Sequence, residues 1–292
     1  MKELKFKKID AFTKGTASGN PAGYIYLDNE SLSEAEMQLI ASQLKGFVNE
    51  AGFLTKTGNS WNLKFYSSEC QVPFCGHATI AIMYDLLSTM NHCDDEVFID
   101  VKAGRLPVFN RIKQEDAVYI MAPEPTFLNH KFTAWQIADI LGIDEAEISD
   151  ELPVRLIDGG LRTLIVPLKS LNCCLKMFPD QERLKHFSIN NNFDIVLTFV
   201  DETSTGSKYR TRVFAPKYGY LEDPATGSGN SAFGYYLMDE NLWEEDFTIE
   251  QGPSLNNPNH VKLKKYSKDG RKRILFGGSA TTRITGSYLL HG

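Results

Sequence analysis

The chain has 292 residues, of which 42% are hydrophobic and 23% charged, so it is long enough to bury one large core or two ordinary ones. This balance excludes a disordered chain, and a net charge of −6 without a clustered basic patch argues against a nucleic-acid-binding surface. No stretch approaches the roughly 18 consecutive apolar residues of a membrane-spanning helix. The first residues also lack the apolar core of a signal peptide, so we expect a cytoplasmic protein without a membrane partner.

The five cysteines are an odd number in a large chain, which favours reduced thiols over a disulfide framework. Their spacing also fits a zinc site poorly, because no C-x-x-C pair occurs. The cysteine and histidine positions considered for a metal are Cys70, Cys75, His77, His92 and Cys93. The sequence therefore predicts no metal site.

In chain order, the first half alternates short strands with helices. The segment 32–44 has a helical pattern, with Ser33 as its cap and two glutamates in its first turn. The segments rich in β-branched and aromatic residues, or alternating in polarity, predict strands. These segments are 1–8, 51–54, 62–66 and 97–101.

The second half repeats this order of elements. Residues 74–79 (Phe-Cys-Gly-His-Ala-Thr) and residues 225–230 (Ala-Thr-Gly-Ser-Gly-Asn) each precede an apolar helix, and Cys75 corresponds to Thr226. The alternative is a coincidence between two strand–helix junctions, but the shared order on both sides favours a duplicated unit. The strands expected around the second motif are 195–200, 209–214 and 247–250.

Both of the helices that follow these motifs are apolar almost all round, and a helix of that kind is buried on every side. We therefore expect an α+β fold of two pseudo-symmetric lobes, each a curved, barrel-like sheet around a central buried helix. The two prolines of residues 121–125 mark the boundary. The N-terminal lobe is then 1–122 with a C-terminal return at about 282–292, and the C-terminal lobe is 123–281.

Two further segments in the second half carry local signals. Residues 133–148 predict a helix capped by Thr133. The basic residues 271–273 directly follow Asp269 and Gly270, which is typical of the exit from a hairpin turn.

A glycine-containing turn at the start of a buried helix can form an anion-binding site. The first N–H groups of a helix lack partners and the peptide dipoles add positive potential there, so such an end binds a carboxylate or phosphate. The alternative is that the glycines only permit close helix–sheet packing. Because the arrangement occurs twice with polar side chains beside it, we expect both helix ends to face one acidic substrate.

Glu50 is the candidate proton shuttle, since it stands among apolar residues at a strand start. Desolvation would raise the pKa of its carboxyl group and suit it to acid/base work near neutral pH. An exposed turn residue beside Asn49 is the alternative.

The remaining polar candidates each have an ordinary structural alternative. His77, at a helix start, is expected to be neutral, and it could equally be a hydrogen-bonded core histidine. Asp223 before a proline is common in turns, and Ser228 could be a plain helix cap. Cys75 suggests a nucleophile beside His77, or a small buried apolar residue.

Together these residues resemble the phenazine-biosynthesis isomerase-like (PhzF-like) family, within the wider diaminopimelate-epimerase-like fold. The matching motifs cover nearly the whole chain in the family's order. They are Asp10-Ala11-Phe12-Thr13 with Gly19-Asn20-Pro21-Ala22, Asn49-Glu50-Ala51-Gly52-Phe53, Phe74-Cys75-Gly76-His77-Ala78-Thr79, Glu222-Asp223-Pro224-Ala225-Thr226-Gly227-Ser228-Gly229 and Gly277-Gly278-Ser279-Ala280.

The resemblance implies a cofactor-independent isomerase, usually a homodimer, that moves a proton on a small carboxylate-bearing substrate in a site between its lobes. It implies no metal, with Glu50 as the acid/base and Cys75 as a further candidate. The residues implied in substrate binding are Asn20, Gly76, His77, Ala78, Asp223, Thr226, Gly227 and Ser228.

One departure limits the chemistry. Epimerases of the wider fold use two cysteines, one from each lobe. In this sequence Cys75 stands at the first of these positions, but Thr226 stands at the second. A threonine hydroxyl is too weak an acid to replace a thiol. Proton transfer by Glu50 alone therefore fits better. The alternatives are a cysteine-dependent epimerase or racemase with another partner for Cys75, and a ligand-binding relative that has lost the chemistry.

Overall fold

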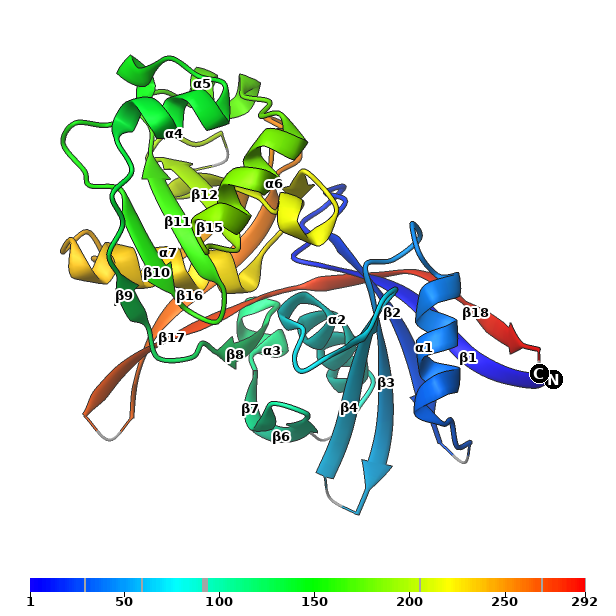
Figure 1. The fold of residues 1–292 in the computed structure, drawn as a ribbon. Helices are drawn as coiled ribbons and strands as arrows, with labels where there is room; N and C mark the ends of the chain where they lie inside the picture. Colours follow the sequence, from blue (N-terminus) through cyan, green and yellow to red (C-terminus); the bar gives the residue numbers. More distant parts are fainter. Residues whose placement is uncertain (29, 59, 91–93, 205, 269, 292) are drawn as a thin grey trace. The chain divides into compact units, whose positions relative to one another are not determined.

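The computed structural model describes residues 1–28, 30–58, 60–90, 94–204, 206–268 and 270–291. It separates into two compact units (Figure 1). Unit 1 comprises Met1–Thr13, Ser18–Met121 and Gly277–Gly292, and unit 2 comprises Lys14–Ala17 and Ala122–Phe276. The division at Met121 and Ala122 falls directly before the two prolines that suggested a boundary. His92, Cys93 and Asp269 lie outside the described residues.

Unit 1 consists of one sheet with helices on it. Its elements are β1 (Lys2–Ala11), β2 (Asn20–Leu27), α1 (Glu34–Gln43), β3 (Glu50–Thr57), β4 (Ser60–Ser67), β5 (Gln71–Val72), α2 (Gly76–Ser88), β6 (Glu96–Val101), β7 (Gly104–Asn110), α3 (Ile112–Glu115), β8 (Val118–Met121) and β18 (Ala280–Leu290). The predicted start of α1 is confirmed, because Ser33 accepts from the Glu36 amide while the Glu36 carboxylate accepts from the Ser33 amide.

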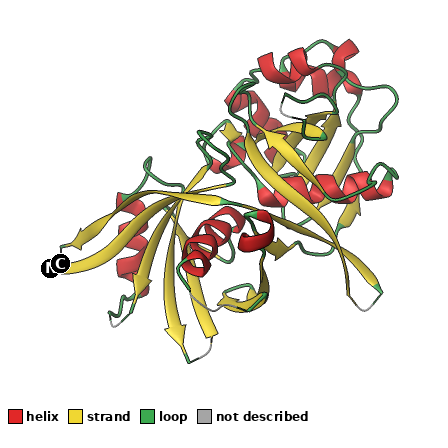
Figure 2. Cartoon of the chain, turned by 180° about the vertical axis from the view of Figure 1, so that it is seen from behind, coloured by secondary structure: helices red, strands yellow, loops and turns green. Residues whose placement is uncertain are grey.

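The sheet of unit 1 curls around α2. Its strands run in the order β18-β1-β2-β3-β4-β6-β7-β8. Helix α2 packs against β18, β1 and β2 near one end of this order and against β8 at the other. A helix that touches both ends of a sheet is enclosed by it, which explains why α2 is apolar almost all round (Figure 2).

Unit 2 is built in the same way. Its elements are β9 (Thr126–Leu128), α4 (Ala134–Leu141), a 3₁₀ turn (Glu145–Glu147), β10 (Arg155–Asp158), β11 (Arg162–Pro167), α5 (Leu171–Lys176), α6 (Gln181–Asn190), β12 (Ile195–Val200), β13 (Tyr209–Phe214), a 3₁₀ turn (Pro216–Tyr218), β14 (Glu222–Asp223), α7 (Gly227–Asp239), β15 (Phe247–Gln251), β16 (Asn259–Lys268) and most of β17 (Arg271–Gly278). Helix α7 packs against β10, β11, β12 and β16, and most of its residues are buried.

The strand pairing confirms the internal repeat. In unit 1 the pairs β1–β2, β2–β3, β3–β4, β4–β6 and β6–β7 are antiparallel, parallel, antiparallel, parallel and antiparallel in turn. The pairs β10–β11, β11–β12, β12–β13, β13–β15 and β15–β16 of unit 2 follow the same sequence. Each motif opens a helix of 13 residues, so the expected fold of two related lobes with central helices is correct.

The helix predicted over 133–148 is wrong in its length. Thr133 does cap α4, with Gln136 completing a capping box, but the helix ends at Leu141. Gly142 follows with a φ of +68°, in the left-handed region, and this conformation terminates the helix. Only a 3₁₀ turn, Glu145–Glu147, forms in the remainder. Within the described residues, no helix has the length and apolarity needed to cross a bilayer.

Gly277 marks a close approach between two strands of unit 1. A Cβ at this position would lie 2.2 Å from the Val118 carbonyl oxygen of β8 and 2.6 Å from the Tyr119 ring. The carbonyl belongs to a hydrogen-bonded strand and cannot move aside as a side-chain tip can. Gly286 of β18, in contrast, has no atom within 4 Å of such a Cβ.

We therefore expect Gly277→Ala to lower the free energy of unfolding by about 1–3 kcal/mol, because the added methyl group overpacks the strand contact. Gly286→Ala is the matched control and should change it by less than about 0.5 kcal/mol. Urea denaturation followed by circular dichroism measures both. Equal stability of the two variants would contradict the close approach.

Candidate active site

Glu50 is the first residue of β3, in the middle of the unit 1 sheet. Its backbone lies opposite Ala22 of β2 and Ser67 of β4. Asn20 and Pro21, which begin β2, therefore lie at the same end of the sheet. The Glu50 side chain keeps 21% of its surface exposed, so it is a partly buried strand residue rather than an exposed turn residue.

The start of α2 lies beside this strand end. Cys75 is the N-cap, in an extended conformation with φ −137° and ψ 111°, and its side chain makes no capping hydrogen bond. Its carbonyl oxygen accepts from the Thr79 amide, the first hydrogen bond of the helix. Since helix geometry gives the amides of Gly76, His77 and Ala78 no partner within the helix, they are available to an acceptor outside it.

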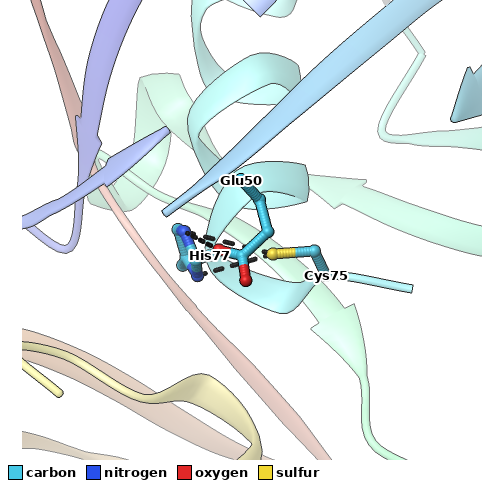
Figure 3. Close-up of side chains that lie close together, drawn as sticks. All are labelled: Glu50, Cys75 and His77. Atoms are coloured by element: carbon cyan, nitrogen blue, oxygen red, sulfur yellow. Dashed lines mark hydrogen bonds and ion pairs between the residues drawn. The ribbon is translucent and has the colours of Figure 1, made fainter. Parts of the chain in front are cut away.

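Glu50, Cys75 and His77 form one cluster (Figure 3). The Nε2 atom of His77 lies 3.3 Å from the Glu50 Oε2 atom. The Cys75 sulfur is hydrogen-bonded to the imidazole, at 3.5 Å from Nδ1 and 4.0 Å from Nε2. Of the sequence-predicted site residues, the structure therefore brings the candidate base, the candidate thiol and the candidate histidine within reach of one another.

His77 is held as a neutral imidazole. Burial lowers the pKa of its ring from the ordinary 6.5 to about 4, and a hydrogen bond to the backbone of Pro21 opposes this shift. The sequence-based expectation of a neutral ring is correct in outcome, but burial rather than the helix dipole is the main cause. A neutral ring beside Glu50 can take or give a proton without carrying a permanent charge.

The corresponding motif in unit 2 is held by buried polar groups. Thr226 is the N-cap of α7, in nearly the same conformation as Cys75, with φ −121° and ψ 103°. Its hydroxyl donates to the Asp223 carboxylate instead of capping the helix. The buried side chain of Gln251 accepts from the amide of Thr226, at 2.9 Å, and donates to the Asp223 carbonyl oxygen, at 2.8 Å.

Sequence reasoning missed two residues of this network. Gln251 and Asn230 were not singled out, although Asn230 also donates to Gln251, at 2.6 Å, and belongs to the repeated motif. A polar residue at the end of β15 is the signal that could have found Gln251. Ser228 is not the helix cap, because α7 begins at Gly227 after Thr226.

Comparison with solved structures defines the class of fold. The structure of a phenazine biosynthesis protein of the PhzF family from Bacillus anthracis matches with a TM-score of 0.89 and 25% sequence identity, over 99% of this chain and 100% of that chain. Epimerase structures share the same fold. The two units with their enclosed helices are therefore an epimerase-like fold, in agreement with the resemblance found in the sequence.

Residues 9–286 match the PhzC-PhzF family, described as phenazine biosynthesis-like protein, and the chain belongs to this family. The uncharacterised isomerase YfhB of Bacillus subtilis is 31% identical over 97% of this chain and 99% of its own length. The trans-2,3-dihydro-3-hydroxyanthranilate isomerase of Pseudomonas fluorescens is 25% identical over 97% of this chain and 98% of its own length. The protein is accordingly an isomerase.

The protonation state of His77 can be measured directly. We expect its imidazole to titrate near pH 4 by NMR, because burial disfavours the cation. As the pH falls from 6.5 towards 4, the unfolded chain binds a proton at His77 that the folded state does not bind, so the His77 contribution to the free energy of unfolding decreases in that window and is constant above it.

His77→Gln should make the decrease in the free energy of unfolding shallower, although His260, with a pKa also lowered to about 4 by burial, still contributes. The groups facing His77 are the Glu50 carboxyl and the Cys75 thiol. A His77 midpoint at or above 6.5 would show that the ring is not desolvated.

Proposed function

We propose that this isomerase moves a proton on a small, carboxylate-bearing substrate without a cofactor, using Glu50 as base and then as acid. The observation that carries the proposal is the 3.3 Å contact between Glu50 and a partly buried, neutral His77 at the start of α2. General bases are found in such partly desolvated positions with a second proton-accepting group in reach.

In the proposed reaction, the Glu50 carboxylate alone both removes and returns the proton. Glu50 removes a proton from one substrate carbon, and the electron pair of the broken C–H bond moves along the conjugated system. Glu50 then returns the proton to a different carbon and becomes a carboxylate again. Substrate and product are isomers, and no electrons are transferred to another molecule.

The beginning of α2 supplies an anchor for the negative charge of the substrate. The amides of Gly76, His77 and Ala78 have no partner in the helix, and the helix dipole adds positive potential at this end. The Cys75 side chain leaves these amides uncapped. Asn20, buried at the start of β2, is the fourth proposed substrate-binding residue of unit 1.

The proposal extends to unit 2 through the internal repeat. Four residues surround the beginning of α7 as their counterparts surround the beginning of α2, and the family resemblance assigns them to substrate binding. They are Asp223, Thr226, Gly227 and Ser228. From the same resemblance, the proposal includes a homodimer and a cytoplasmic location.

Glu50→Gln should lower turnover by about 10²–10⁴-fold while the substrate still binds, because an amide cannot accept the proton. The probe substrate is trans-2,3-dihydro-3-hydroxyanthranilate, the compound in the name of the isomerase from Pseudomonas fluorescens. Turnover in deuterated water should place deuterium on a carbon of the wild-type product. Binding is measured by isothermal titration calorimetry.

Glu69→Gln is the matched control, since Glu69 is an exposed carboxylate paired with Lys45 at the surface. It should retain wild-type turnover. Full activity of Glu50→Gln would remove Glu50 from its proposed role, even if the protein remained an isomerase.

The hydrogen bond between Cys75 and His77 favours a second candidate function. In a cysteine-dependent epimerase or racemase, the Cys75 thiol would be one of two groups that exchange protons with a substrate carbon from opposite faces. Thr226, the equivalent N-cap of unit 2, is no substitute for the second thiol, and its hydroxyl is already bound to Asp223.

Cys75→Ser separates the two candidates. With Glu50 as the acid/base, this variant should lose less than about tenfold in turnover of the probe, because a serine preserves the shape of the site. With Cys75 as the acid/base, the loss should reach about 10²–10⁴-fold, because a serine hydroxyl is a far weaker acid. Steady-state kinetics of the variant decides between them.

A further inference from the structure

The cluster at the start of α2 combines three different metal-binding groups. The carboxylate of Glu50, the sulfur of Cys75 and an imidazole nitrogen of His77 lie within 4.8 Å of one another. Spacing along the chain could not reveal this set, because Glu50 comes from β3 and the other two residues from the start of α2. Such a cluster can bind a metal ion whether or not the reaction requires one.

The separations are close to those of a zinc site. Bond lengths of about 2.3 Å to sulfur and about 2.0–2.2 Å to nitrogen and oxygen place tetrahedral zinc ligands about 3.3–3.6 Å apart. The His77 Nε2 and Glu50 Oε2 atoms are 3.3 Å apart, and Nε2 is 4.0 Å from the Cys75 sulfur. The ligand atoms of all three residues lie within 4.8 Å of one another, so the sulfur must move closer to reach the separations of a zinc site.

The surroundings of the ring also resemble those of a metal ligand. Ligating histidines usually donate their second ring nitrogen to a backbone carbonyl or carboxylate, which fixes the orientation of the ring. His77 is hydrogen-bonded to the backbone of Pro21, which restricts the orientation of its ring. The side chains of Glu50 and His77 keep 21% and 13% of their surface exposed, so an ion can enter from solvent.

We propose that Glu50, Cys75 and His77 bind Zn²⁺ reversibly and that the bound ion inhibits the enzyme. The inhibition rests on the proposed function of Glu50, whereas the binding does not. A thiolate with an imidazole and a carboxylate selects zinc over Mg²⁺ and Ca²⁺, which prefer oxygen ligands. The thiol releases its proton to solvent on binding, and the two anionic ligands then balance the charge of the ion.

The bound ion inhibits because it occupies the group that must move the proton. A carboxylate that coordinates zinc is no longer free to accept a proton from carbon. With three protein ligands, the fourth position stays open to water or to a carboxylate of the substrate. Zinc is therefore an inhibitor of the proposed reaction and not its cofactor.

The binding is tested with the full chain after treatment with a chelator, using Co²⁺ as a spectroscopic substitute for Zn²⁺. A near-ultraviolet thiolate-to-cobalt charge-transfer band that Zn²⁺ removes is expected. Cys75→Ser should lose the band and weaken Zn²⁺ binding, measured by calorimetry, by at least about tenfold. Cys70→Ser, which removes an exposed thiol, is the control and should keep both.

Absence of the band from the wild type, or its persistence in Cys75→Ser, would overturn the proposed site. In the activity assay, Zn²⁺ should inhibit the wild type and Cys70→Ser alike, and a chelator should restore turnover. Binding without inhibition would overturn the inhibitory role. If Glu50→Gln remained active while the band was present, the proposed function would fail and the metal site would stand.

Discussion

The burial of a helix on all its faces is the constraint on which this structure depends. Helices α2 and α7 have almost no polar face, so each is stable only when a sheet closes around it. Closure brings the N-terminus of the helix into the interior, where its unpaired amides need polar partners. Unit 2 supplies side chains around this end, namely Asp223, Asn230 and Gln251. Unit 1 places Glu50, Cys75 and His77 there.

The duplicated units have thus diverged at one equivalent position. Cys75 and Thr226 have nearly the same backbone conformation, and neither caps its helix with its side chain. Thr226 is tied to Asp223 and Gln251 in a buried network, which keeps the turn fixed. The Cys75 sulfur is hydrogen-bonded to His77, in a cluster with solvent access. The backbone has been kept as a scaffold while the chemistry of the side chains has changed.

The sequence predicted the local structure well, because local signals determine it. The strands 195–200 and 209–214 have the predicted bounds, and Ser33 and Thr133 cap their helices as expected. The over-long helix after Thr133 shows the limit of periodicity, since one left-handed glycine outweighed the apolar residues beyond it. The sequence also predicted Glu50 and His77 as site residues through their motifs, and the structure brings these two side chains into contact.

The arrangement within the site could not be predicted, because it depends on strand register. The pairing of Glu50 with Ala22 and Ser67 sets where the carboxylate meets α2, and no local pattern encodes that pairing. Gln251 escaped notice for the same reason, since its partners are distant in the chain. The main cause of the neutral state of His77, its burial, also becomes visible only in the folded unit.

The pairing of the first strand with the last has a consequence for synthesis on the ribosome. Strand β1 is hydrogen-bonded to β18 along its whole length, from Lys2 opposite Leu290 to Ala11 opposite Ala280, as the adjacent chain ends in Figure 1 also show. The sheet around α2 therefore stays open until β18 has emerged, whereas the strands enclosing α7 are already available. The sheet of unit 2 can therefore close first, while the apolar helix α2 of unit 1 stays uncovered until β18 is available. A chaperone would be of most use during this interval.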